Sequence, residues 1–142
     1  MASTDAAPTP ARARPLSPHL SVYRLTLTMV MSGLHRITGM ALYASVLLLA
    51  WFLMAASMDA TAFGVASGFL NSILGRLILF GFTWSLFHHM LGGIRHFIWD
   101  AGLGMDAPER EWLAWGTLIG GFVLAILVWA IGLAVYQGAR VS

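Results

Sequence analysis

The 142-residue chain is far more apolar than a soluble domain, with 58% hydrophobic residues, 10% charged residues and a mean hydropathy of +0.77, so its composition indicates a membrane protein. It has no cysteine, which excludes disulfides and thiolate metal sites and leaves histidine, methionine or a partner chain to hold any redox cofactor. All eight basic residues are arginines at the ends of apolar runs, a pattern that argues against nucleic-acid binding, which needs them clustered among stacking aromatic residues.

Residues 1–14 are small and polar and include two prolines, so we expect a disordered, solvated N-terminal tail before a membrane-anchor domain over 15–142. The tail lacks the apolar core of a secretory signal. Its arginine, serine and threonine content would suit a mitochondrial transit peptide, but Asp5, the prolines and the short length oppose that interpretation. From Pro15 to Met31, prolines and interfacial residues predict a segment along the membrane surface.

Three apolar runs follow, and each is long enough to cross the bilayer as a helix. The uncharged stretches contain 22, 18 and 28 residues, over 37–58, 77–94 and 112–139, against about 20 residues for a typical span. We therefore predict an all-α membrane protein with transmembrane helices at about 31–58, 70–98 and 112–137. A short loop with at most a helical turn is expected at 59–69, and an exposed connector at 100–111, which contains four of the six acidic residues.

The distribution of arginine predicts the orientation. With three crossings, the N-terminus and the 100–111 connector share one side, which carries six of the eight arginines. By the positive-inside rule this side is cytoplasmic. The lysine-free, alanine-rich composition is typical of a GC-rich bacterial genome, so we expect the bacterial inner membrane, with the mitochondrial inner membrane as the alternative.

The second predicted helix carries three of the five histidines. Residues three or four apart share a helical face, which places the following residues on one stripe: Gly81, Ser85, His89, Gly93 and His96. Small neighbours around His89 would let a flat macrocycle lie close to the helix, as an axial imidazole on haem iron requires. His88 instead shares its face with Trp84, whose indole would obstruct a porphyrin.

Spacing therefore favours His89 as a ligand and leaves His88 as a hydrogen-bonding or lipid-interface residue. The structural alternative for either histidine is a neutral imidazole bonded within the bundle. No second axial ligand lies at matching depth in the sequence, so a bound haem would be shared with another subunit. In the third helix, Gly116-x-x-x-Gly120, with Gly121 beside it, predicts a helix-packing face.

The start of the first helix holds a second polar cluster. Ser32 and Arg36 lie one turn apart on one face, with Tyr43 about two turns deeper. A hydroxyl and a guanidinium could donate hydrogen bonds to a quinone carbonyl or a haem propionate. The alternative is that Arg36 only extends to phospholipid headgroups.

Two motifs resemble the signatures of a known family, the cytochrome b subunit of succinate dehydrogenase, which is the larger membrane anchor of respiratory complex II. They read Arg14-Pro15-Leu16 followed by Ser32-x-x-His35-Arg36-x-Thr38, and His89-x-x-x-Gly93-Ile94-Arg95-His96-x-x-x-Asp100-x-Gly102. The resemblance covers residues 14 to about 137, and the run from Pro15 to Leu20 is similar to the alphaproteobacterial and mitochondrial branch.

The resemblance implies a haem-containing heteromeric helix bundle in which His89 is an axial ligand to haem b and the small anchor subunit supplies the other. It further implies that Ser32 and Arg36 line the ubiquinone site beside the iron-sulfur subunit, and that His35 and Arg36 lie near the haem propionates. For Arg95, His96 and Asp100 we expect docking to the soluble subunits or pairing with one another.

By the same resemblance, the chain does no succinate chemistry itself, because the flavin and the iron-sulfur clusters belong to the flavoprotein and iron-sulfur subunits. Two alternatives stand beside this interpretation. One is the anchor of a quinol:fumarate reductase, and the other is a haem-free structural or small transport membrane protein.

Overall fold

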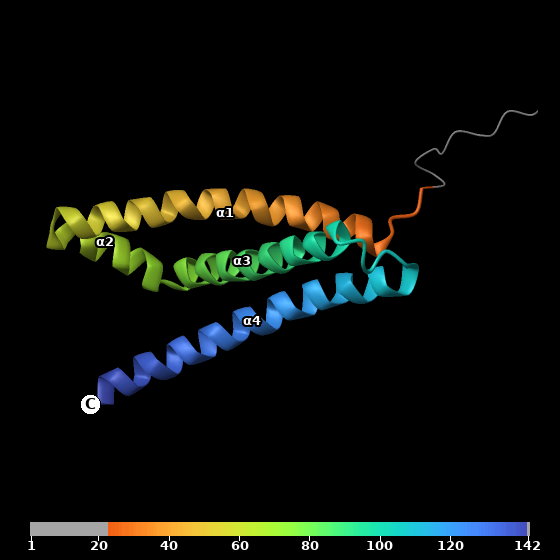
Figure 1. Ribbon diagram of the computed structural model, residues 1–142. Helices are drawn as coiled ribbons and strands as arrows, with labels where there is room; N and C mark the ends of the chain where they lie inside the picture. The colour runs from red at the N-terminus through yellow and green to blue at the C-terminus, as the bar shows by residue number, and fades with distance from the viewer. Residues whose placement is uncertain (1–22, 142) are drawn as a thin grey trace, which may run out of the picture.

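The computed structural model describes residues 23–141, and the predicted 1–14 tail lies outside this range (Figure 1). Between residues 23 and 141 the chain is helical and contains no strand. Its four helices are α1 (Leu27–Met58), α2 (Ala60–Asn71), α3 (Ile73–Asp100) and α4 (Ala107–Val141). The three long helices are apolar enough to cross a membrane, with spans of 28 to 33 residues. At about 1.5 Å per residue, each exceeds the roughly 30 Å hydrocarbon core.

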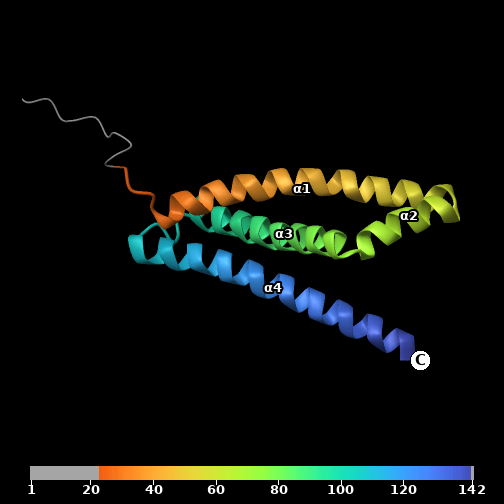
Figure 2. The same ribbon diagram turned by 180° about the vertical axis from the view of Figure 1, so that it is seen from behind.

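The long helices run up and down in chain order (Figures 1 and 2). At one end, called here the N-terminal end of the bundle, α1 and α4 begin and α3 ends. At the opposite α2 end, α2 folds back and leads into α3. The central helix α3 packs against both α1 and α4. Toward its C-terminus α4 diverges from the other helices in both views.

The segment 59–69, which was predicted to be a loop, is helical from residue 60 onward. It forms most of the 12-residue helix α2. Asp59 begins this helix by accepting a hydrogen bond from the backbone N–H of Ala62 at 2.8 Å, and Ser72 both ends α2 and caps the start of α3. Alanine favours helix, and the two caps satisfy exposed backbone groups. The expectation of a loop was therefore wrong, and α3 begins at Ile73 rather than at 70.

The first and last helices both begin earlier than predicted. The first helix begins at Leu27, four residues before the predicted 31, because the prolines that bar a helix lie no later than Pro18. The last helix begins at Ala107 rather than 112. Pro108 stands in its first turn, where a missing N–H costs no hydrogen bond. The connector shrinks to residues 101–106, where Gly102 and Gly104 adopt positive φ angles of 76° and 71°.

The interface between α3 and α4 consists of small and polar residues. The buried residues on these helices include Ser85, His88 and Arg95 on α3, and Ala114, Thr117, Gly121 and Ala125 on α4. A Cβ added to Gly121 would lie 3.1 Å from the Cα of His88, whereas one at Gly116 would meet nothing within 4 Å. The close approach that the glycine pattern predicted is thus made at Gly121 and at Gly120, where an added Cβ would lie 3.0 Å from Cδ1 of Leu91, and not at Gly116.

Candidate functional site

Ser32 and Arg36 lie on one exposed face of α1, near the N-terminal end of the bundle. Both side chains are exposed, and the same face continues through Met40 and Tyr43, which are 66% and 76% exposed. Within residues 23–141 neither Ser32 nor Arg36 has a hydrogen-bond or ion-pair partner. The predicted pairing of these two residues on one face is therefore observed. Neither side chain is buried against the other helices of the described chain.

His89 lies between α3 and α1 and contacts the helix turn that follows Arg36. Its Nδ1 is 3.1 Å from the backbone oxygen of His35 and 3.5 Å from Oγ1 of Thr38. Because a carbonyl oxygen can only accept a hydrogen bond, Nδ1 is the donor, and in a neutral imidazole this leaves the lone pair on Nε2. Nε2 has no hydrogen-bond partner among residues 23–141, and it is not one of the fully buried polar atoms.

His35 completes the contact between α1 and α3. Its ring stacks on that of His89, with centroids 3.9 Å apart and planes inclined by 15°. The ring of His96 approaches His35 edge-on at 5.6 Å. The Nε2 atom of His35 is buried and has no partner within the described residues. His35, which is 54 residues before His89 in the sequence, thus joins His89 and His96 near the N-terminal end of the bundle.

His88 faces the opposite way from its neighbour. Its side chain is 1% exposed and lies against the backbone of Gly121 on α4 and the ring of Trp84, whose centroid is 5.3 Å away. Neither ring nitrogen has a hydrogen-bond partner in the described part of the chain. The expectation that His88 lies at the lipid interface was wrong, because the close approach of α4 encloses the ring, and the hydrogen-bonding alternative stays a prediction.

The side chain of Arg95 turns into the bundle rather than toward its surface. It is 3% exposed, and its guanidinium carbon lies 5.0 Å from the centre of the Trp99 ring, a cation–π contact. His96 and Asp100 are exposed. Among residues 23–141 Arg95 forms no ion pair, and its Nε and Nη1 atoms are buried without partners. No ion pair joins Arg95, His96 and Asp100 within the described residues, and the alternative, docking to the soluble subunits, stays a prediction.

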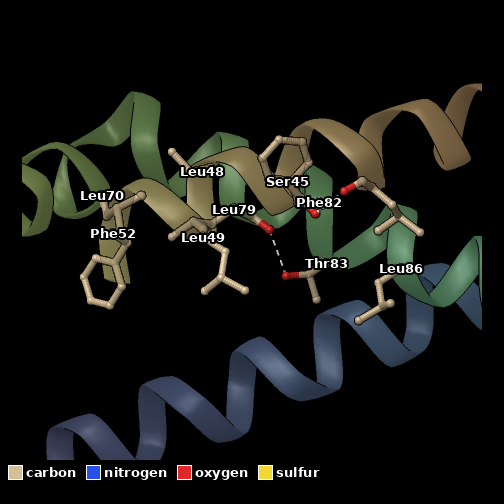
Figure 3. A pocket seen from close by; sticks show the side chains of 10 residues that line it. Ser45, Leu48, Leu49, Phe52, Leu70, Leu79, Phe82, Thr83 and Leu86 are labelled. Carbon is tan, nitrogen blue, oxygen red and sulfur yellow. Dashed lines mark hydrogen bonds between the residues drawn. The ribbon is translucent and has the colours of Figure 1, made fainter. Parts of the chain in front are cut away.

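An apolar pocket of about 430 Å³ lies between α1 and α3, beyond His89 toward the α2 end (Figure 3). Its lining includes Leu42 and Leu86, each three residues from the contact between Gly39 and His89. The two hydroxyls in the lining are occupied, because Ser45 donates to the Leu42 carbonyl and Thr83 to the Leu79 carbonyl. The pocket therefore suits an apolar group.

Sequence reasoning gave no role to Thr38, Gly39 or Gly92, although the structure brings all three to the His89 site. Thr38 is 1% exposed and donates to the backbone oxygens of Leu34 and His35 at 2.9 and 3.0 Å. Gly39 contacts the His89 ring, and Gly92 contacts the His35 ring. One usable signal was the spacing of four residues between His35 and Gly39, which puts them on one helical face.

Comparison with known proteins agrees with the two sequence motifs. The model of the family described as succinate dehydrogenase/fumarate reductase transmembrane subunit matches residues 10–134. The succinate dehydrogenase cytochrome b556 subunit of Paracoccus denitrificans is 44% identical over 114 residues, covering 80% of this chain and 88% of that protein.

Two further relatives are also similar to this chain. The corresponding b556 subunit of Rickettsia felis is 34% identical over 116 residues, or 82% of this chain and 90% of that protein. The mitochondrial cytochrome b560 subunit of Sus scrofa is 42% identical over 98 residues, or 68% of this chain and 58% of that protein. The resemblance inferred from the motifs is confirmed, and the chain belongs to the succinate dehydrogenase/fumarate reductase transmembrane subunit family.

Proposed function

We propose that this chain is the membrane-anchor subunit of a succinate:ubiquinone oxidoreductase, shares a b-type haem with a small anchor subunit and contributes to the ubiquinone site. The observation that carries the proposal is the geometry of His89, whose Nδ1 donates to the His35 carbonyl and whose Nε2 is unpaired. A metal-binding histidine typically donates its other ring N–H to a carbonyl or carboxylate, which fixes the tautomer and the ring orientation.

The residues around His89 fit a haem. An apolar pocket begins one turn away and could receive part of a hydrophobic macrocycle. The unpartnered Nε2 of His35 and the exposed guanidinium of Arg36 could donate hydrogen bonds to propionates. When bound, haem b supplies one-electron exchange at its iron. The enclosed ring of His88 has no comparable space, because Gly121 and Trp84 flank it.

Ser32 and Arg36 are proposed to bind the ubiquinone that accepts the electrons. Both can donate hydrogen bonds, and together they would orient the quinone and polarise its carbonyl groups. Polar side chains at a lipid-facing position are costly. We therefore propose that the iron-sulfur subunit and the small anchor subunit cover this face of α1 and complete the site.

The names of the relatives support our proposals for the direction of the reaction and the cellular location. The family description includes fumarate reductase, but the three relatives compared above are all named as succinate dehydrogenase subunits. We propose that this chain anchors the flavoprotein and iron-sulfur subunits, performs no succinate chemistry and lies in the bacterial inner membrane with its N-terminus in the cytoplasm. The six-to-two arginine distribution supports this orientation.

The quinone assignment predicts a selective loss of quinone reduction in Arg36→Gln and Ser32→Ala. Losing a charged hydrogen bond costs about 1.5–3 kcal/mol, which is roughly a tenfold to hundredfold loss of rate, and losing a neutral one costs about 1 kcal/mol, or roughly fivefold. The measurement compares succinate:ubiquinone activity with dye-coupled succinate oxidation in the same membranes, and only the former should fall.

Matched controls are Arg76→Gln and Ser57→Ala, whose exposed side chains lie near the α2 end of the bundle. They should leave both activities unchanged. Normal quinone reduction in both Arg36→Gln and Ser32→Ala would remove the site assignment.

A further inference from the structure

The contact between α1 and α3 at His89 is reciprocal. Each helix contributes one histidine ring and one glycine, and each ring lies against the glycine of the other helix. His89 of α3 contacts Gly39 of α1, and His35 of α1 contacts Gly92 of α3. We call these four residues the histidine–glycine interlock. Since α1 and α3 run antiparallel, the two ring–glycine contacts lie side by side and allow the rings to stack at 3.9 Å.

Neither glycine leaves room for a larger residue. A Cβ at Gly39 would lie 3.0 Å from Cε1 and 3.4 Å from Nδ1 of His89. A Cβ at Gly92 would overlap the His35 ring and lie 3.2 Å from its Nε2. Because protein interiors are close-packed, even one added methyl group must displace a ring or separate the helices.

The interlock also restrains the rotation of the His89 ring. The His35 carbonyl accepts hydrogen bonds from Nδ1 of His89 at 3.1 Å and from Oγ1 of Thr38 at 3.0 Å. This carbonyl lies one helical turn before Gly39, so the glycine that makes room for the ring and the oxygen that orients it belong to the same turn of α1. Stacking fixes the plane of the ring, and the hydrogen bond fixes which nitrogen faces away from α1.

We propose that Gly39 and Gly92 are positioning residues for the haem ligand. By letting α1 and α3 approach closely, they allow His35 to support the His89 ring so that Nε2 keeps a single direction. The proposal rests on the proposed function at one point, which is that His89 binds the haem iron. Outer-shell groups that orient a metal ligand affect metal affinity about 10- to 100-fold and tune the redox potential.

The test uses Gly39→Ala and Gly92→Ala in the assembled complex, with Gly33→Ala as the control. Gly33 lies on α1, and a Cβ there would meet nothing within 4 Å, so the control carries the same change in helix propensity without the clash. The readouts are the haem midpoint potential and the low-spin electron paramagnetic resonance signal, with dye-coupled succinate oxidation as the measure of assembly. Both interlock variants should shift the potential and the resonance, and the control should match wild type.

A rescue experiment separates a specific clash from general damage. If the methyl group at Gly92→Ala acts by displacing the His35 ring, then Gly92→Ala should add little to the shift in haem signals that His35→Ala causes alone, so the two substitutions will not be additive. If Gly92→Ala alone fails to assemble, recovery of assembly in the double variant supports the interlock, and its absence contradicts it.

Haem signals identical to the control in both glycine variants would overturn the positioning role while leaving ligation by His89 intact. Lack of any b-type signal in the wild-type complex would instead overturn the proposed function.

Discussion

The adjacent residues His88 and His89 have opposite environments. His89 contacts α1 and keeps one nitrogen unpaired, whereas His88 is enclosed by α4 with both nitrogens unpartnered in the described chain. Helical spacing alone favoured His89, because Trp84 shares the face of His88. Spacing could not predict that His35 stacks on His89, since that contact depends on how far α1 is rotated and shifted against α3. The register is determined by packing at Gly39 and Gly92, which no local pattern encodes.

The buried nitrogens of His88 lead to a stability prediction. Leaving a buried polar group unpaired costs about 1–3 kcal/mol, so replacing the ring with an apolar one of similar shape should not destabilise the protein. We expect His88→Phe to keep or raise the melting temperature of the complex, measured by thermal loss of dye-coupled activity. His96→Phe, at an exposed position, is the control. A clear drop in melting temperature only for His88→Phe would mean that these nitrogens have partners in the assembled complex.

At the scale of the elements, hydropathy correctly predicted the three long helices that can cross a bilayer. It did not predict α2, whose helical form depends on local packing. The three spans follow from long uncharged runs, because an unsatisfied backbone is costly in the bilayer and a helix satisfies it internally. The sequence did not predict helix α2, because its small residues, such as Gly64, Ser67 and Gly68, are typical of loops. Its helical form depends on the cap at Asp59 and on contact with the start of α3.

That contact depends on Gly75. A Cβ added there would overlap the backbone oxygen of Phe69 and lie 2.8 Å from the Cα of Leu70. Backbone atoms cannot move aside as a flexible side chain can, so we expect Gly75→Ala to destabilise the corner by about 1–3 kcal/mol. Thermal unfolding of the purified complex measures this loss. Gly68→Ala, where a Cβ meets nothing within 4 Å, should be neutral or stabilising, and equal behaviour of the two variants would contradict this account of the corner.

At the scale of the whole molecule, the described helices leave most of their apolar surface uncovered. Most large apolar side chains on α1 and α4 are exposed, including Leu47 at 64% and Val135 at 66%, and they require lipid or partner helices to cover them. The same holds for three polar groups that have no partner within residues 23–141. These are the side chains of Ser32 and Arg36 and the Nε2 atom of His89. The sequence predicted this incompleteness from the missing second axial ligand. It could not predict which surfaces meet which partner, because those contacts are not local.

The most direct test of the central claim is the reduced-minus-oxidised visible spectrum of the purified complex, with haem quantified relative to flavin. The comparison is between His89→Leu and His88→Phe. We expect His89→Leu to lose the b-type absorbance while flavin and dye-coupled activity remain, and His88→Phe to keep the wild-type spectrum. Loss of the signal in His88→Phe, with a normal spectrum in His89→Leu, would contradict this expectation.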